Sequence, residues 1–147
     1  MAFDWGPSKD AVIIALKAPP QSGGEEKVIL LDTGTSTRTE LLTVPALLRA
    51  AGLQGRGSLT GLALAPDRRR LGVSASVRGL GDSVRDCLLL YDLVGGGGHL
   101  LREFPPKETV GSFAWAPDGR SLAVGIVSEK SDLFVWEAAG TRQVALR

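Results

Sequence analysis

The chain has 147 residues, 44% of them apolar and 5% aromatic, and its seventeen basic and sixteen acidic residues leave a net charge of +1. This balance excludes a global field that would favour nucleic acid or an anionic membrane as the main partner. A single cysteine, Cys87, and a single histidine, His99, exclude an intramolecular disulfide, a cysteine zinc cluster and most other metal sites, so we expect no metal and no cofactor.

The first part of the chain alternates short apolar runs with turn residues, which predicts a series of short strands. The expected strands are Phe3–Trp5, Ala11–Leu16, Lys27–Leu31 and Arg38–Val44. Pro and Gly break the pattern at Ala18–Gly24, and a turn is expected at Asp32–Ser36. Pro45–Gly52 then predicts a two-turn helix, because Pro suits a first helical position and Gly closes a helix.

The rest of the chain repeats the four-strand pattern twice. The expected strands are Leu59–Ala65, Leu71–Val77, Cys87–Leu93 and His99–Phe104 in the second unit, and Val110–Ala116, Leu122–Val127, Leu133–Glu137 and Thr141–Leu146 in the third. The loop between the two middle strands is long and polar in the second unit, at Arg78–Arg85, and short in the third, at Ser128–Ser131. Each unit therefore contains four short strands in the same order.

One stretch, Phe113–Val124, occurs in three versions along the chain. It predicts a strand, a Pro-Asp-Gly turn and a returning strand, and its counterparts are Leu62–Val73 and Phe3–Ile14. The third strands also end alike, on the acidic residues Asp32, Asp92 and Glu137. Four-stranded repeats of about 40–50 residues are typical of β-propeller blades.

Two of these stretches resemble the WD-repeat-like β-propeller family. Phe113-Ala-Trp-Ala-Pro-Asp-Gly-Arg120 is similar to its first-strand signature, and Phe134-Val-Trp-Glu137 to its third-strand signature. No Gly-His pair precedes any first strand, and Arg85 or Lys130 stands where the family has an acid before the third-strand aromatic residue. The resemblance implies an all-β fold of three four-stranded antiparallel blades that diverge from the best WD repeats.

The expected organisation is a single half-propeller. Blade 1 covers residues 1–44, an inter-blade insertion residues 45–57, blade 2 residues 58–106 and blade 3 residues 107–147. Closed propellers generally have four to eight blades, so three blades leave two end faces without a neighbour. We expect the arc to close on a second copy as a six-bladed homodimer or to complete another protein's propeller. A piece of a longer propeller is the other open alternative.

The sharpest competing signal is Asp32-Thr33-Gly34, which follows an apolar strand and resembles the active-site turn of aspartic proteases. In that family two aspartates share a proton and supply acid and base. The same residues stand in register with Asp92 and Glu137, which predicts a simple hairpin turn. We favour the turn and keep the hydrolase as an alternative.

The expected function is therefore a non-catalytic protein–protein interaction scaffold, with no catalytic, cofactor-binding or metal-binding residue. Long loops on a rigid scaffold are where binding usually occurs. Three such segments share one face of the expected propeller, and we expect a protein partner there, with no nucleic acid and no membrane. They are Ala18–Glu26, Pro45–Gly57 and Arg78–Arg85. Ligand or sugar binding in the channel of the assembled ring is a further alternative.

The expected location is cytoplasmic. The first residues carry no basic and apolar leader of the secretory kind. Every apolar run is also shorter than the roughly 18 residues that a membrane span requires.

Overall fold

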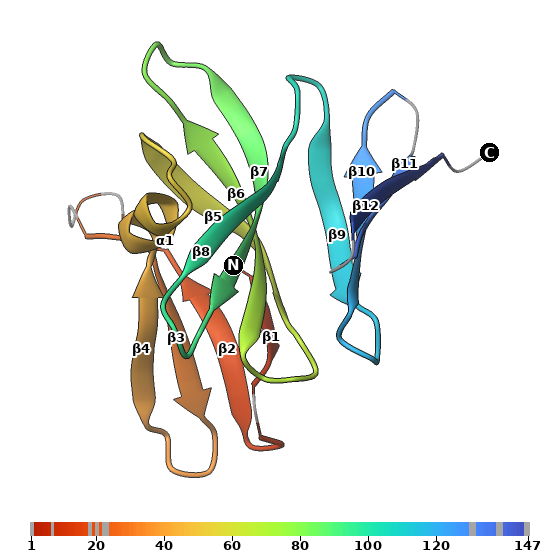
Figure 1. Cartoon of the computed structure of the whole chain (residues 1–147). Helices are drawn as coiled ribbons and strands as arrows, with labels where there is room; N and C mark the ends of the chain where they lie inside the picture. Colours follow the sequence, from red (N-terminus) through yellow and green to blue (C-terminus); the bar gives the residue numbers. More distant parts are fainter. Residues whose placement is uncertain are drawn as a thin grey trace.

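The computed structural model describes residues 2–6, 8–17, 19, 21, 24–129, 132–137 and 140–145. Over these residues the chain forms short strands and one helix (Figure 1). The elements are β1 (Phe3–Trp5), β2 (Ala11–Leu16), β3 (Lys27–Asp32), β4 (Arg38–Thr43), α1 (Val44–Ala50), β5 (Arg56–Leu64), β6 (Arg70–Arg78), β7 (Val84–Asp92), β8 (Gly98–Glu103), β9 (Thr109–Trp115), β10 (Ser121–Val127), β11 (Asp132–Glu137) and β12 (Gly140–Ala145). Parts of the expected segments Ala18–Gly24, Ser128–Ser131 and Thr141–Leu146 lie outside the described residues.

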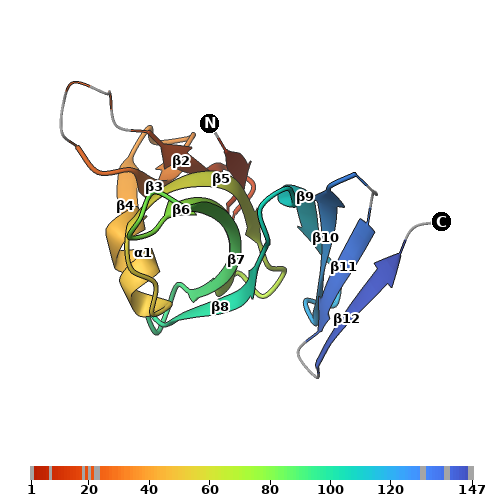
Figure 2. The ribbon, with the colours of Figure 1, turned by 90° about the horizontal axis from the view of Figure 1, so that it is seen from above.

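The strands form three separate four-stranded antiparallel sheets, in which each strand pairs with the next one along the chain. We call the sheets blade 1 (β1–β4), blade 2 (β5–β8) and blade 3 (β9–β12). Their first strands lie next to one another, since β5 contacts both β1 and β9. Viewed from above, blades 1 and 3 lie on either side of blade 2 (Figure 2). This arrangement confirms the predicted all-β partial propeller.

Blade 2 has longer strands than expected. β6 and β7 pair as far as Arg78 and Val84, and β5 begins at Arg56, which pairs with Arg78. The expected loop Arg78–Arg85 was therefore wrong in its extent, because only residues 79–83 connect the two strands. The ends of these strands were not predicted because they carry polar side chains. These side chains have partners in the sheet: Ser76 donates to the Asp86 carboxylate, and Arg85 forms an ion pair with Glu103.

The first strands of blades 2 and 3 carry a β-bulge at equivalent places. In β5 the pairing skips Thr60, and in β9 it skips Gly111, which lies 51 positions later, the spacing of the sequence repeat. A bulge bends and twists the strand that carries it. The shared position shows that the repeat extends to the irregularities of the sheet as well as to its apolar residues.

The helix α1 closes blade 1 and leads into blade 2. Thr43 is its N-cap, and the Thr43 hydroxyl accepts the Ala46 N–H at 3.3 Å. The helix ends at Ala50, and Gly52 follows it with a φ of +73°, which suits glycine. The predicted helix at Pro45–Gly52 is thus confirmed, one residue earlier at its start. No helix in the described part of the chain is long and apolar enough to cross a membrane.

Two apolar cores lie between the three blades, one at each junction. The first lies between blades 1 and 2 and includes α1, whose Val44, Leu47 and Leu48 are buried. The second lies between blades 2 and 3 and is built from Leu88, Phe104, Leu122, Val124, Ile126 and Phe134. Both cores are inter-blade interfaces, so each blade is stabilised mainly by its neighbours.

Candidate binding surfaces

The loop face of the propeller carries the connection from α1 to β5 and the β6–β7 hairpin (Figure 1). These are two of the three segments in which we expected binding. Of the third, Ala18–Glu26, only residues 19, 21 and 24–26 are among the described residues. The surface that follows is therefore built from the other two segments.

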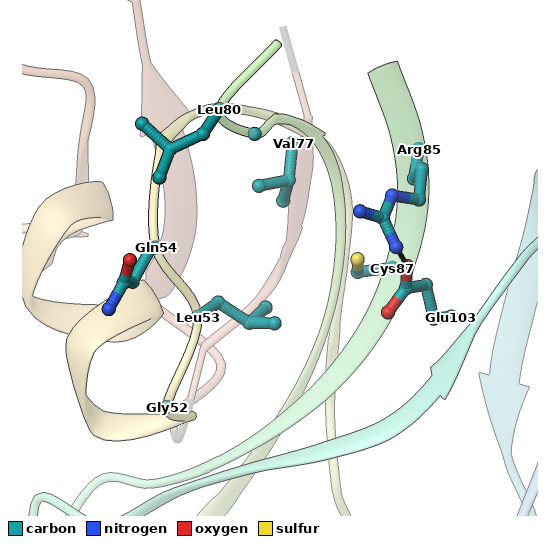
Figure 3. A pocket seen from close by; sticks show the side chains of 9 residues that line it. Gly52, Leu53, Gln54, Val77, Leu80, Arg85, Cys87 and Glu103 are labelled. Carbon is teal, nitrogen blue, oxygen red and sulfur yellow. Dashed lines mark hydrogen bonds and ion pairs between the residues drawn. The ribbon is translucent and has the colours of Figure 1, made fainter. Parts of the chain in front are cut away.

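A pocket of about 290 Å³ lies between the α1–β5 connection and the β6–β7 hairpin (Figure 3). Its lining residues are Gly52, Leu53, Gln54, Val77, Gly79, Leu80, Arg85, Cys87 and Glu103. Val77 and Cys87 are buried, and Leu53 is half-buried. Leu80 stands 89% exposed on the hairpin, and the Arg85–Glu103 ion pair borders the other side. The pocket thus combines apolar walls with a charged, paired rim.

Glycines shape the two loops beside this pocket. Gly55 has a φ of +120°, and a Cβ there would lie 2.2 Å from the Arg78 carbonyl oxygen. The two loops therefore approach each other more closely than any side-chain-bearing residue would allow. In the hairpin, the Gly79 N–H donates to the Ser83 carbonyl at 3.1 Å, and Gly81 and Asp82 have positive φ values. Both loops are held by backbone contacts.

Cys87 contributes an inert thiol to the pocket. Its side chain is 2% exposed. Burial, together with the negative charges of Glu103 and Asp86, raises the pKa of Cys87 to about 11, although Arg85 acts in the opposite direction. The thiol therefore stays protonated at neutral pH, whereas a nucleophilic cysteine requires the thiolate.

Asp32-Thr33-Gly34 lies in the β3–β4 hairpin, as the turn interpretation predicted. The Asp32 carboxylate accepts the Thr35 N–H at 2.9 Å, and hydrogen bonds from the Thr35 backbone and side chain lower the pKa of Asp32. Asp92 does the same in blade 2, where it accepts the N–H groups of Gly95 and Val94, which lower its pKa. The aspartates of both blades thus act as hydrogen-bond acceptors within their own hairpin turns.

No other chemistry-bearing cluster is found in the part of the chain that the structure describes. There, no three residues of the types His, Cys, Asp and Glu come close enough together to hold a metal ion. His99 is exposed on β8.

The blade faces form a second kind of candidate surface. We call the face that a blade turns towards the preceding blade its leading face, and the opposite face its trailing face. On blade 3 the leading face carries Phe113 and Trp115, which pack against the second core. The Trp115 indole N–H donates to the Ala63 carbonyl of blade 2 at 3.0 Å, and the Arg70 guanidinium lies 5.1 Å from the Trp115 ring centre.

The leading face of blade 1 is uncovered. Phe3 and Trp5, which stand at the positions of Phe113 and Trp115, are each 71% exposed. Phe3 pairs with Ile14 and Trp5 with Val12, so these side chains share one face of the sheet. In blade 2 the equivalent position, Leu62, is 8% exposed. Blade 1 thus exposes large apolar residues at positions that pack against the preceding blade in blades 2 and 3.

Sequence reasoning identified the loop face but missed the pocket. It is built by residues about 30 positions apart, from Gly52–Gln54 and Gly79–Arg85, that meet only when β5 pairs with β6. The available signals were Leu80, an apolar residue in a polar hairpin, and the glycines at 52 and 55.

Comparison with known proteins identifies the fold. No protein-family model matches the sequence, and no curated protein matches it either. The β-propeller domain of the Trilobed protease from Pyrococcus furiosus matches with a TM-score of 0.65 and 13% identity, over 97% of this chain and 42% of that chain. The chain has the fold of a β-propeller segment. TolB from Acinetobacter baumannii matches this propeller segment with a TM-score of 0.64 and 14% identity, over 91% of this chain and 30% of that chain.

A third match is the acylaminoacyl peptidase from Pyrococcus horikoshii, with a TM-score of 0.61 and 13% identity over 98% of this chain. The propeller segment spans 24% of that peptidase, and less than half of each of the other two matched chains. At these identities the likeness concerns the fold alone.

Proposed function

We propose that this propeller segment is a non-catalytic, cytoplasmic protein-interaction scaffold that self-assembles or completes another protein's propeller. The observation that carries the proposal is the 71% exposure of both Phe3 and Trp5 on the leading face of blade 1. Exposed apolar patches on an otherwise packed protein mark interaction sites. The chain spans only 42% of the matched β-propeller domain and 30% of the matched TolB, which supports completion by further blades.

The partner-binding part of the proposal rests on the loop face. Leu80 is 89% exposed beside a pocket with apolar walls, and the Arg85–Glu103 pair borders it. An apolar centre with a polar rim is the usual anatomy of a protein–protein interface. Because the two loops are held by backbone contacts, little conformational entropy is lost when a partner binds.

Affinity capture with matched variants tests the loop face. We expect Leu80→Asp to lose a partner that the wild-type chain retains, because the charge opposes burial of this position. Val94→Asp is the control, since Val94 is 70% exposed but lies at the other end of β7. Equal capture by both variants would contradict recognition at the loop face.

Solution mass tests the assembly. We expect the chain, alone or with a propeller partner, to run above its own mass of 15.4 kDa in light scattering. A dispersed monomer that also captures no propeller protein would contradict the proposal. Kinship of the blades with WD repeats is part of the same proposal and is supported by the first- and third-strand sequences.

An aspartic-protease-like hydrolase through Asp32-Thr33-Gly34 remains the alternative function, together with ligand or sugar binding in the channel of an assembled ring. The hydrogen bond that the Asp32 carboxylate accepts from the Thr35 N–H, matched by the one that Asp92 accepts from the Gly95 N–H, supports the turn. A peptide-cleavage assay at acid pH tests the hydrolase. Cleavage that Asp32→Asn abolishes, with Asp92→Asn as the matched control, would establish the hydrolase.

A further inference from the structure

We propose that the leading face of blade 1 binds the trailing face of blade 3 in a second copy of this chain, so that two chains close head to tail into a six-bladed ring. The inference rests on the proposed function and deepens it, because it names the occupant of the uncovered face. The interface between blades 2 and 3 is its template.

In that template, large residues of the leading face pack on small residues of the trailing face. A Cβ at Gly61 would lie 2.7 Å from Cε1 of Phe113, and one at Gly72 would lie 3.3 Å from Cε2 of the same ring. The Phe113 ring therefore packs directly against the backbone of blade 2. Beside it, the Trp115 N–H reaches the Ala63 carbonyl. The contact requires small residues in the preceding blade.

The trailing face of blade 3 carries small residues at the same four positions, but Ser112 and Ala123 stand where Gly61 and Gly72 contact the Phe113 ring. In blade 2 the four positions form two cross-strand pairs, Gly61 with Ser74 and Ala63 with Gly72. The positions 51 residues later form the corresponding pairs in blade 3: Ser112 with Gly125 and Ala114 with Ala123. We call these four residues of blade 3 the seat.

The seat is uncovered in the single chain. Ser112, Ala114 and Ala123 are exposed, and Gly125 is half-buried. Leu133 and Val135, on the neighbouring strand β11, extend the same face with apolar side chains and are half-buried. A trailing face with small residues near the propeller axis and aliphatic residues further out is thus available for a leading face.

Blade 1 offers the matching leading face. Phe3 and Trp5 have the registers of Phe113 and Trp115, since Phe3 pairs with Ile14 as Phe113 pairs with Val124, and Trp5 pairs with Val12 as Trp115 pairs with Leu122. In this arrangement the Phe3 ring faces Ser112 and Ala123 of the second copy, and it must lie further from the sheet than Phe113 does, because these two residues carry a Cβ that Gly61 and Gly72 lack. The Trp5 indole N–H then points at the Ala114 carbonyl of the second copy.

A single chain cannot form this contact with itself, because blade 2 separates the two faces (Figure 2). Two chains can, since each supplies one leading and one trailing face. The resulting ring has twofold symmetry and leaves no face unpaired, which is the usual outcome for a homo-oligomer. Six blades also lie within the range of closed propellers.

A further difference from the template also weakens the new junction. Arg70, which lies over Trp115 and donates to the Gly119 carbonyl at 2.7 Å, has Ser121 as its counterpart in blade 3. The junction between chains therefore lacks this cation–π contact. Ser121→Arg is expected to restore it at both junctions of the dimer and to lower the dimer dissociation constant about fivefold to thirtyfold.

Sedimentation velocity with matched variants tests the inference. We expect the wild-type chain to run at twice 15.4 kDa and Ala123→Trp to run as a monomer, because the indole fills the seat. Ala46→Trp is the control, since Ala46 is exposed on α1, away from both end faces, and it should remain dimeric. Circular dichroism and protection of Cys87 from thiol reagents establish that each variant is folded.

A mixing experiment distinguishes the arrangement. Trp5→Ala should also give a monomer, but a mixture of Trp5→Ala and Ala123→Trp should form a weak heterodimer, because one of its two junctions is intact. A dimer that Trp5→Ala breaks and Ala123→Trp leaves unchanged would pair the two leading faces and overturn the inference. A monomeric wild-type chain would also overturn it, whereas the proposed function would then still stand or fall by the capture of another propeller protein.

Discussion

The two interfaces between blades fill equivalent spaces in different ways. Between blades 1 and 2, the helix α1 contacts β4, β5 and β8 and supplies Val44, Leu47 and Leu48 to an aliphatic core. Between blades 2 and 3, a single segment after β8 supplies Phe104, which is fully buried. The Arg102 guanidinium lies 5.0 Å from the Phe104 ring centre and 4.9 Å from that of Phe134.

The difference shows what an insertion does in a propeller. Neighbouring blades spread apart towards the outside of the ring, so the outer part of each interface needs extra volume (Figure 2). Where the chain inserts a helix, the strands can keep aliphatic side chains. Where it inserts no helix, a few aromatic side chains fill the space and pack against a surface that contains glycines. The second interface therefore depends on fewer residues and should be the easier one to break.

The largest expected effect is at Phe104. Phe104→Ala removes the largest fully buried side chain of the second interface and should lower the free energy of unfolding by about 4 kcal/mol. Urea unfolding followed by tryptophan fluorescence measures the change, because Trp115 and Trp136 border this core. Phe104→Leu serves as the control and should lose roughly a third as much. Equal losses would mean that the interface does not depend on the ring.

Leu47→Ala tests the first interface in the same way. Leu47 is fully buried in α1, and the variant should lose about 3 kcal/mol. Cys87 lies in the same core, and its thiol is buried and protonated at pH 8, so an aromatic disulfide reagent should react slowly with the wild type. The reaction should become faster in Leu47→Ala and stay slow in Phe104→Ala. A similar rate in both variants would show that the two interfaces open together.

The pH dependence of Cys87 has a defined sign. The pKa of the thiol is about 11 in the folded chain and 9.0 as the ordinary value, so the unfolded state loses its proton first as the pH rises. The stability linked to Cys87 is fully present below pH 9.0 and is lost towards pH 11. Cys87→Ala, measured by thermal unfolding between these two values, should remove this part of the slope; an unchanged slope would contradict the assignment.

Overpacking of the second interface should also lower the free energy of unfolding, by a smaller amount. Gly61→Ala places a Cβ 2.7 Å from the Phe113 ring and should cost about 2 kcal/mol. Gly97→Ala is the matched control, since a Cβ there meets nothing within 4 Å. Thermal unfolding of the two variants gives the comparison. If they unfold alike, the close ring-to-backbone contact does not hold in solution.

The smallest expected effect concerns one hydrogen bond of the second interface. Trp115→Phe keeps an aromatic ring but removes the N–H that donates to the Ala63 carbonyl, and should cost about 1 kcal/mol. The first interface has a different polar link, in which the Asp4 carboxylate accepts the Leu64 N–H at 2.7 Å. Urea unfolding of Trp115→Phe measures this loss, and part of it should shrink as the ionic strength rises, because the Arg70 guanidinium lies 5.1 Å from the Trp115 ring centre.

Local patterns were sufficient to predict most of the fold. Apolar runs, turn residues and the threefold repeat of Phe113–Val124 predicted the strands and their order, and Pro45 with Gly52 predicted the helix. The extent of β6 and β7 escaped prediction, because polar residues there, among them Asp86, find partners across the sheet that no local pattern reveals. The register shift at Thr60 is likewise a property of paired strands.

The candidate surfaces were predictable in part. Loop length indicated the loop face, but the pocket depends on a close approach between Gly55 and the Arg78 carbonyl, which only the folded sheet produces. Asp32 could be assigned to a turn from its register with Asp92, and the hydrogen bond to Thr35 confirms the turn. The exposure of Phe3 could not be predicted from the repeat, because Phe3 and Phe113 stand at equivalent positions of it and only one of them has a described blade to pack on.

The β-bulges at Thr60 and Gly111 have a consequence for re-engineering of the chain. Because the irregularity recurs in blades 2 and 3 at the spacing of the repeat, exchange of segments between these two blades preserves the inside and outside of every strand only in steps of a whole blade. A crossover displaced by one residue within a strand would turn the ring-bearing positions to the opposite face. Changes of length can be absorbed only in the hairpins, of which Gly95–Gly98 is the most permissive by composition.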